Sequence, residues 1–302
     1  MGARPGSGTV VAVLIVGVAA VSAAAIFIRL AFAAAGHSGP GVALLLAGVR
    51  LGAAALLLAP TWRGLLRTRT QPGARGLAAL AGVFLAAHFG TWVTSLAYTS
   101  VAASVTIVTT NPIWVALFGW LWLGERVGRL TLGGILLATT GGVLIGLGDA
   151  AGGSAGSAPL LGDALALVGA WTVSGYFLLG REAQRRGLSI GQYVAVAYAT
   201  AAAVLLPLPA FFGTPYTGWP PIVYGYALAM ALTSQLVGHT GFNWAVRWIP
   251  PVLVTLAILF EPLGSGFLAY LFFGEVPPPL VFAGAGVLLA GVALAVLGQA
   301  RS

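Results

Sequence analysis

The sequence predicts an all-α polytopic membrane protein, with ten transmembrane helices in two inverted five-helix repeats and both termini in the cytoplasm. Composition, the number of long apolar segments and a motif that recurs after half the chain predict this class. Hydrophobic residues make up 59% of the 302 residues and charged residues only 7%, whereas a soluble domain carries about 25% charged residues. The mean hydropathy is +0.99, so the bilayer is the expected solvent for most of the chain.

Ten segments are long and apolar enough to cross a bilayer, which takes about 20 residues of helix. The apolar run over residues 9–35 exceeds the roughly 7–15 residues of a signal-peptide core, so we interpret it as the first span. The predicted spans cover residues 9–34, 42–59, 77–97, 101–123, 130–148, 160–180, 192–212, 222–246, 252–273 and 280–297. The connections are mostly short and rich in Gly, Pro and Ser.

The arginines predict the orientation, because cytoplasmic loops collect positive charge. With the N-terminus inside, twelve of the arginines fall in cytoplasmic segments and none in an outer loop. These twelve are Arg4, Arg63, Arg67, Arg69, Arg75, Arg126, Arg129, Arg181, Arg185, Arg186, Arg247 and Arg301. The net charge of +8 is therefore explained by the membrane, and we expect no nucleic-acid partner.

A motif recurs at a constant offset in the fourth and ninth predicted spans. Pro112, Gly124 and Glu125 each have a counterpart 150 residues later, at Pro262, Gly274 and Glu275. Each half holds five spans, and an odd number means that the second half enters the membrane upside down. We therefore expect residues 1–150 and 151–302 to be inverted repeats within one membrane domain. Inverted repeats are typical of secondary transporters, whose substrate sites lie near mid-membrane.

Polar residues within a span are costly and mostly face a bundle interior or a watery cavity. In the eighth span Gln235, His239 and Asn243 recur at steps of four, which places them on one helical face. His88 and Trp92 present a similar face on the third span. We predict that both faces line a substrate cavity, with hydrogen bonding between helices as the alternative role.

The sixth span carries Trp171 and Tyr176 below its predicted outer edge. An aromatic ring at this depth suits contact with the apolar part of a substrate. Packing in the protein core explains the same pattern, and the sequence leaves both interpretations open.

Glu261 and Asn111 occupy equivalent positions, each directly before a proline. Proline removes a backbone donor and breaks a helix, so Pro112 and Pro262, with Gly264 beside the latter, are predicted hinges. A carboxylate in a dry site needs a proton or a partner. We therefore name Glu261 and Arg50, a cation within the second span, as candidate coupling residues; a structural ion-pair role is the alternative.

Several other classes are excluded or disfavoured by the motifs. The chain has no cysteine, no P-loop and no metal-binding motif, so thiol chemistry and ATP-driven transport are excluded and no cofactor or metal is expected. Gly146 to Asp149 spells the GxGD string of intramembrane aspartyl proteases. With 44 glycines in the chain we interpret that match as chance and expect no enzyme. A channel remains an alternative, although no filter or charged ring is evident.

The endings NPIWVALFGWLWLGE (residues 111–125) and EPLGSGFLAYLFFGE (261–275), together with the ten spans, resemble the EamA-type members of the drug/metabolite transporter superfamily. The first span and Arg50 are also similar to that family. Within it, the YddG-like exporters of aromatic and other amino acids are the most similar type. The resemblance implies a basket of ten helices with a central cavity, alternating access, residence in the inner membrane and export.

We therefore predict a secondary transporter of small amphipathic metabolites, most of all amino acids, working as a monomer in the lipid bilayer. Protons are a candidate coupling ion. Trp92, Trp171 and Tyr176 are predicted to contact apolar parts of the substrate, and His88, Gln235, His239 and Asn243 its polar parts. Nucleobases, nucleotide sugars and drugs are the alternative substrates.

Overall fold

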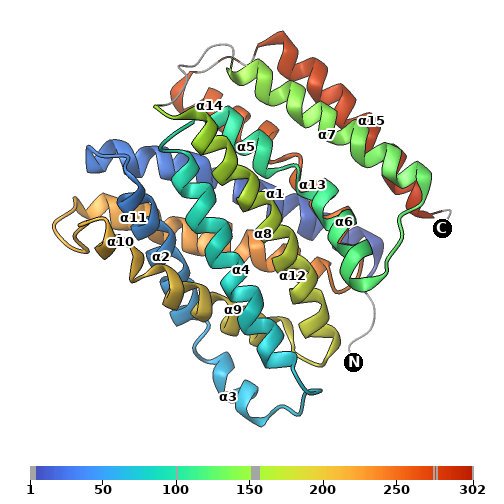
Figure 1. Cartoon of the computed structure of the whole chain (residues 1–302), viewed down its shortest axis with the longest axis horizontal. Helices are drawn as coiled ribbons and strands as arrows, with labels where there is room; N and C mark the ends of the chain where they lie inside the picture. The colour runs from blue at the N-terminus through green and yellow to red at the C-terminus, as the bar shows by residue number, and fades with distance from the viewer. Residues whose placement is uncertain (1–4, 100, 151–156, 275, 277, 301–302) are drawn as a thin grey trace.

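The computed structural model describes residues 5–99, 101–150, 157–274, 276 and 278–300. Within these residues the regular structure is helical, and no strand is present. The helices in chain order (Figure 1) are α1 (Ser7–Ala35), α2 (Pro40–Leu57), α3 (Thr61–Arg67), α4 (Ala74–Ser95), α5 (Val101–Val108), α6 (Asn111–Leu123), α7 (Arg129–Ala150), α8 (Pro159–Arg185), α9 (Ile190–Leu205), α10 (Leu208–Phe211), α11 (Pro221–Met230), the π-helix η1 (Ala231–His239), α12 (Thr240–Ala245), α13 (Pro251–Ile258), α14 (Glu261–Phe273) and α15 (Pro279–Ala300).

Nine helical segments among the described residues are long and apolar enough to cross a membrane, which fits a polytopic membrane protein. Four of them contain a change of helix: α5 gives way to α6, α9 to α10, α11 to η1 and α12, and α13 to α14. The remaining predicted span, residues 130–148, coincides with α7. Its described apolar stretch, Arg129–Ile145, is shorter than the others, so the count of ten remains a prediction.

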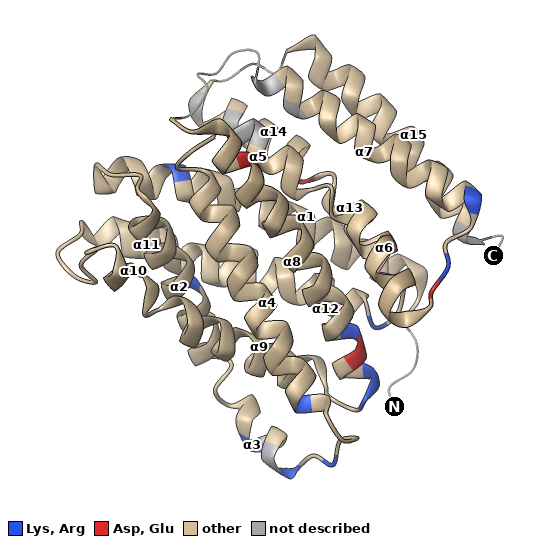
Figure 2. Cartoon of the chain, in the orientation of Figure 1, with Lys and Arg blue, Asp and Glu red and all other residues tan. Residues whose placement is uncertain are grey.

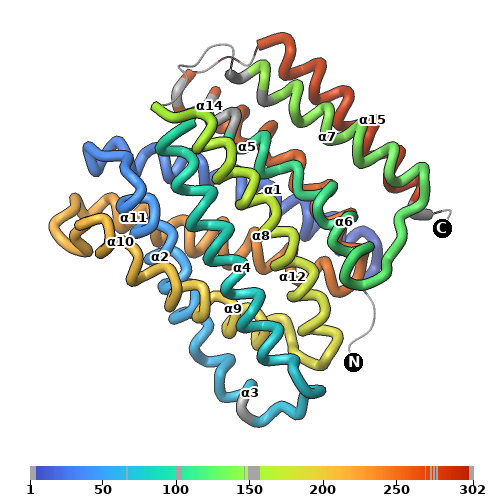
Figure 3. Tube along the Cα trace, viewed as in Figure 1, coloured from blue at the N-terminus to red at the C-terminus, as the bar shows by residue number. Residues whose placement is uncertain are grey.

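The last helices of the two predicted halves, α7 and α15, form a closely packed pair (Figures 1 and 3). Gly134 lies against Ala295, and Gly148, fourteen residues later on the same helix, lies against Val281. Residue numbers rise on one helix as they fall on the other, so the pair is antiparallel. Small residues at the contact let the two backbones approach, as is usual between membrane helices.

The second helices of the two halves are antiparallel as well. Gly48, within α2, lies against Leu206 at the C-terminal end of α9, whereas Thr61, shortly after α2, lies against Gly191 near the start of α9. The first helix of each half packs on the third span of the other: α1 contacts α11, η1 and α12, and α8 contacts α4. The contacts of the first half are thus reproduced in the second, with the partners exchanged.

The glycine of each recurring Pro–Gly–Glu motif ends a helix. Gly124 follows α6 with φ 67° and Gly274 follows α14 with φ 71°, a left-handed conformation that glycine adopts without strain. Glu125, after the first of them, pairs with Arg181 near the end of α8. Glu275, its counterpart, lies outside the described residues.

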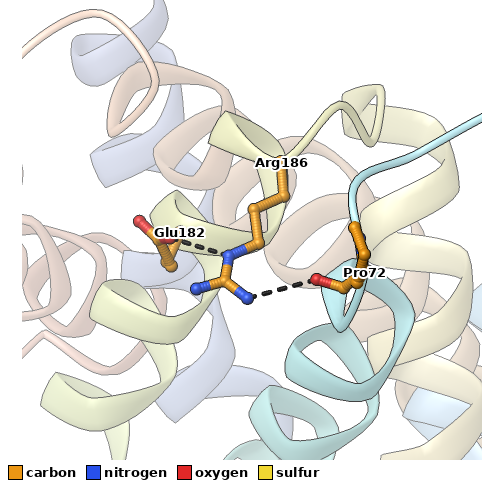
Figure 4. A network of polar contacts seen from close by, with 3 residues as sticks. All are labelled: Pro72, Glu182 and Arg186. Atoms are coloured by element: carbon orange, nitrogen blue, oxygen red, sulfur yellow. Dashed lines mark hydrogen bonds and ion pairs between the residues drawn. The ribbon is translucent and has the colours of Figure 1, made fainter.

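Charged residues gather at one end of the bundle, around α3, the end of α8 and the segment between α6 and α7, while the centres of the helices are mostly uncharged (Figure 2). Arg186 there binds Glu182 at 2.8 Å and donates to the carbonyl of Pro72 at 3.2 Å (Figure 4). These contacts join the end of α8 to the loop before α4. They lie in segments predicted to be cytoplasmic.

Candidate functional site

A narrow cavity lies between helices of both halves. About 480 Å³ of its space is not filled by atoms, including the part open to solvent, and the centres of water-sized molecules reach about 40 Å³. At roughly 10–15 Å³ per water, this conformation holds only a few water molecules. The lining residues are Val21, Ala24, Arg50, His88, Trp92, Val108, Thr109, Asn111, Val173, Phe177, His239, Phe242, Ile258 and Glu261.

Arg50 is the cation of this cavity and is only 2% exposed. It comes from α2, and its Nε donates to Oε1 of Gln235 at 3.0 Å. Its guanidinium carbon lies 4.3 Å from the centre of the Phe89 ring, in a cation–π contact. The hydrogen bond and the ring together fix the plane of the guanidinium at the cavity wall.

Glu261 and Asn111 enter the cavity from two broken spans. Asn111 is the first residue of α6 and Glu261 the first residue of α14, so both stand at helix N-termini in the middle of predicted spans. The N-terminus carries the positive end of the helix dipole, which favours a carboxylate there. Asn111 is 3% exposed, and its Oδ1 has no hydrogen-bond partner among the described residues. The carboxylate of Glu261 and the guanidinium of Arg50 belong to residues that line the same cavity.

The predicted hinge residues lie at these breaks. Pro112 and Pro262 occupy the first turns of α6 and α14, where a missing N–H costs little. A side chain on Gly264 would meet the hydroxyl of Ser22 on α1, so glycine permits a close contact there. The structure therefore places the breaks where the sequence predicts them, and the hinge motion itself remains a prediction.

His88, Trp92 and His239 lie together at the cavity wall. Nδ1 of His88 is 2.9 Å from the carbonyl of Gly169, and its ring stacks on Trp92 with centroids 5.9 Å apart. The rings of His88 and His239 are 6.4 Å apart. Trp92 Nε1 and His239 Nδ1 are buried and form no hydrogen bond in the described part of the chain. Such atoms are candidates for bonding a ligand or water.

Gln235, Tyr176 and Asn243 are buried behind the lining. Gln235 holds Arg50, as described above, and Asn243 Nδ2 donates to the hydroxyl of Tyr176 and to the carbonyl of His239, both at 2.6 Å. The sequence predicts an α-helical face here, but residues 231–239 form a π-helix. The predicted face is therefore divided: His239 reaches the cavity, whereas the other two support it. π-Helices are frequent at functional sites.

Trp171 lies apart from this group. It is 39% exposed at the outside of the bundle and packs edge-to-face on Trp114, with centroids 5.4 Å apart. In this conformation its ring does not line the cavity. Its predicted contact with the substrate stays a prediction.

The predicted binding set omits two residues of this region: Asn111, which lines the cavity, and Phe89, which is buried against the guanidinium of Arg50. Asn111 could have been identified from the sequence, because the 150-residue offset pairs it with Glu261. Phe89 could not, because nothing in the sequence around an aromatic residue of an apolar helix indicates that an arginine from another helix packs on its ring. Three or more His, Asp or Glu residues do not come together in a metal-binding group anywhere in the described ranges.

Comparisons with known proteins agree with this architecture. The model of the EamA-like transporter family matches twice, over residues 9–147 and 160–297. A Streptantibioticus cattleyicolor protein named "Probable terminal-alkyne amino-acid exporter" is 24% identical over 201 residues. That match covers 62% of this chain and 61% of the relative, so it spans less than two thirds of the relative's length.

A protein of known crystal structure has the same fold. It superposes with a TM-score of 0.71 at 20% sequence identity, over 98% of this chain and 99% of that one. At this level of identity the likeness concerns the arrangement of the helices.

Proposed function

Because the chain belongs to the EamA-like transporter family, we propose that it is a secondary transporter of small amphipathic metabolites, with amino acids, aromatic ones included, as its substrates. The observation that carries this proposal is the cavity between the two halves, which combines a buried cation, a carboxylate and aromatic walls. The relative named as an amino-acid exporter supports this substrate class and export as the direction.

The proposed topology has ten membrane helices, with α7 as the fifth span, two inverted five-helix repeats of residues 1–150 and 151–302, and both termini in the cytoplasm. The antiparallel packing of α2 with α9 and of α7 with α15 supports inversion. The arginines at one end of the bundle support the orientation. For such a chain we infer residence in the inner membrane as a monomer.

The proposed mechanism is alternating access. The helices on either side of the breaks at Pro112 and Pro262 rock, so that one side of the cavity closes as the other opens. Gly264 of α14 keeps its close contact with Ser22 of α1. His88, Trp92 and His239 are proposed to contact the substrate directly. Gln235, Tyr176 and Asn243 are proposed to hold the lining in place from behind.

Protons are the proposed coupling ion, with Glu261 as the exchangeable site. The charged and titratable groups that line the cavity with it are Arg50, His88 and His239. A carboxylate that exchanges a proton for a substrate ammonium would link export to the inward flow of protons. Trp171 has no role in this scheme.

The test is counterflow in proteoliposomes that contain the purified full-length protein. We expect labelled phenylalanine or leucine to exchange, with saturable rates that rise when unlabelled amino acid is present on the opposite side. A panel with nucleobases and nucleotide sugars checks the alternative substrates, and mass spectrometry checks that the substrate emerges unchanged.

Two outcomes would contradict the proposal. Conductance that does not saturate would indicate a channel, and a changed product would indicate an enzyme. Flux that ignores an imposed pH gradient would remove the coupling role of Glu261 and leave the carrier mechanism in place.

A further inference from the structure

We propose that the cavity recognises its substrate as a zwitterion, in which Arg50 binds the carboxylate and Glu261, with Asn111, binds the ammonium group. When the cavity widens during transport, the aromatic and aliphatic wall between them receives an apolar side chain. This inference rests on the proposed transport function and specifies how that same cavity selects among small metabolites.

The cationic end is prepared for a carboxylate. A guanidinium has five N–H donors, and the described residues occupy one of those of Arg50, at Nε, through Gln235. The ring of Phe89 covers one face. The terminal nitrogens thus remain as a planar pair of donors with a fixed orientation, which is the geometry that binds a carboxylate through two parallel hydrogen bonds.

The anionic end is prepared for an ammonium group, which has three donors. The carbonyl of Glu261 accepts a hydrogen bond from the hydroxyl of Ser22 at 3.3 Å, and the hydroxyl of Ser265 donates to the carbonyl of Ser22 at 3.1 Å. These two bonds hold the backbone of Glu261 against α1. Asn111 lines the same cavity, and its Oδ1 is buried without a hydrogen-bond partner among the described residues. A carboxylate and an amide oxygen from two equivalent helix starts therefore offer acceptors to one ammonium group.

The charges of the cavity lining favour a ligand with both signs. The lining residues include one arginine, Arg50, and one glutamate, Glu261, and neither Lys nor Asp is among them. Leaving a buried charge without compensation is strongly unfavourable. A simple amine would leave the guanidinium uncompensated, and a simple carboxylic acid would leave the glutamate uncompensated. A zwitterion compensates both.

Much of the remaining wall favours an apolar side chain on the substrate. Val173, Phe177, Phe242 and Ile258 form this part, and a polar group placed against them would lose its hydrogen bonds to water. Unsubstituted aliphatic and aromatic amino acids fit this combination of charged ends and apolar wall.

The experiment compares ligands that differ only in their charged groups, using the full-length protein in nanodiscs and isothermal titration calorimetry. One set is L-phenylalanine, phenethylamine and 3-phenylpropionate; the second is L-leucine, 3-methylbutylamine and 4-methylpentanoate. We expect each amino acid to bind about tenfold or more tightly than either single-charge analogue, because each analogue loses one charged contact. This comparison needs no mutation, so misfolding cannot affect it.

Two variants assign the ends. In Arg50→Gln we expect phenylalanine to bind no better than phenethylamine, and in Glu261→Gln no better than 3-phenylpropionate. The matched controls are Arg186→Gln and Glu182→Gln, which make the same changes in the ion pair at the end of α8 (Figure 4); they should keep the preferences of the unmodified protein.

Equal binding of all three members of a set, or failure of both amino acids to bind, would overturn the inference. If amino-acid counterflow persists but the amino acid and its two analogues bind equally, the zwitterion site alone is refuted. Loss of counterflow for the whole substrate panel would refute the proposed function instead.

Discussion

Buried polar side chains in this protein divide into those that face the cavity and those that support it. Tyr176 belongs to the second kind: it is fully buried, and its hydroxyl accepts a hydrogen bond from Asn243. Tyr216 offers a comparison, because its hydroxyl donates to the carbonyl of Leu206 at 2.6 Å while the residue is 41% exposed. The same chemical group thus stands in a dry site and at an exposed one.

We expect Tyr176→Phe to lower the stability of the protein by about 1–3 kcal/mol, because a donor of Asn243 loses its partner in a buried site. Tyr216→Phe should change it by less than about 0.5 kcal/mol, since the exposed carbonyl finds another donor. Thermal unfolding in one detergent, followed by intrinsic fluorescence, measures both. Unchanged stability with a loss of amino-acid binding in Tyr176→Phe would place this hydroxyl on the substrate and contradict the supporting role.

At this scale the sequence predicts which residues are buried and polar better than it predicts what they touch. Periodicity groups Gln235, His239 and Asn243 on one α-helical face. It contains no signal for the π-helix of residues 231–239, in which the N–H of Thr240 bonds the carbonyl of Gln235 five positions earlier. Trp171 shows a similar gap, because depth in a span does not reveal which side of a helix faces the bundle.

At the scale of elements, glycine spacing explains the tight pairing of α7 and α15. Glycines recur every seventh residue on both helices, at Gly134, Gly141 and Gly148 and, 150 positions later, at Gly284, Gly291 and Gly298. Each of them lies against the partner helix. At these six positions glycine therefore has a packing role.

Neighbouring glycines on α7 provide a matched test of this packing. A Cβ on Gly141 would meet the backbone of α15 at Gly284 and Leu288, whereas a Cβ on Gly133 would meet nothing within 4 Å. We expect Gly141→Val to destabilise the protein by about 1–3 kcal/mol through overpacking, and Gly133→Val to have a much smaller effect. The two variants share any helix-propensity cost, so their difference in unfolding temperature isolates the contact. Equal shifts would contradict the close pairing of α7 with α15.

The positions of the helix breaks can be predicted from the sequence, whereas their arrangement in space cannot. Proline before a long apolar stretch predicts an interruption, and α6 and α14 do begin beside Pro112 and Pro262. Local sequence does not supply the distance between the two breaks. Only the packing of both halves brings Asn111 and Glu261 to one cavity.

For the whole molecule, the prediction of the fold rests mostly on the motif that recurs at an offset of 150 residues. It pairs the helices, and the structure shows that the paired helices α2 and α9, and α7 and α15, run antiparallel. The membrane class and the transporter family follow from composition and motif. The substrate does not, because it depends on which side chains from six or more helices converge, and no short stretch of sequence encodes that convergence.

The central claim is that this cavity is a transport site that opens to each side of the membrane in turn. The chain has no cysteine, so a single introduced thiol reports without background. Ala24 lines the cavity and Ala19, on the same helix, is exposed at the outside of the bundle. Ala24→Cys therefore reports on the cavity and Ala19→Cys is its control.

The measurement is the rate at which a membrane-impermeant thiol reagent modifies Ala24→Cys from each side of sealed proteoliposomes, with and without phenylalanine. We expect modification from both sides, at rates that phenylalanine on one side shifts in opposite directions, and no such response at Ala19→Cys. Simultaneous access from both sides that phenylalanine leaves unchanged, or no access from either side, would contradict alternating access through this cavity.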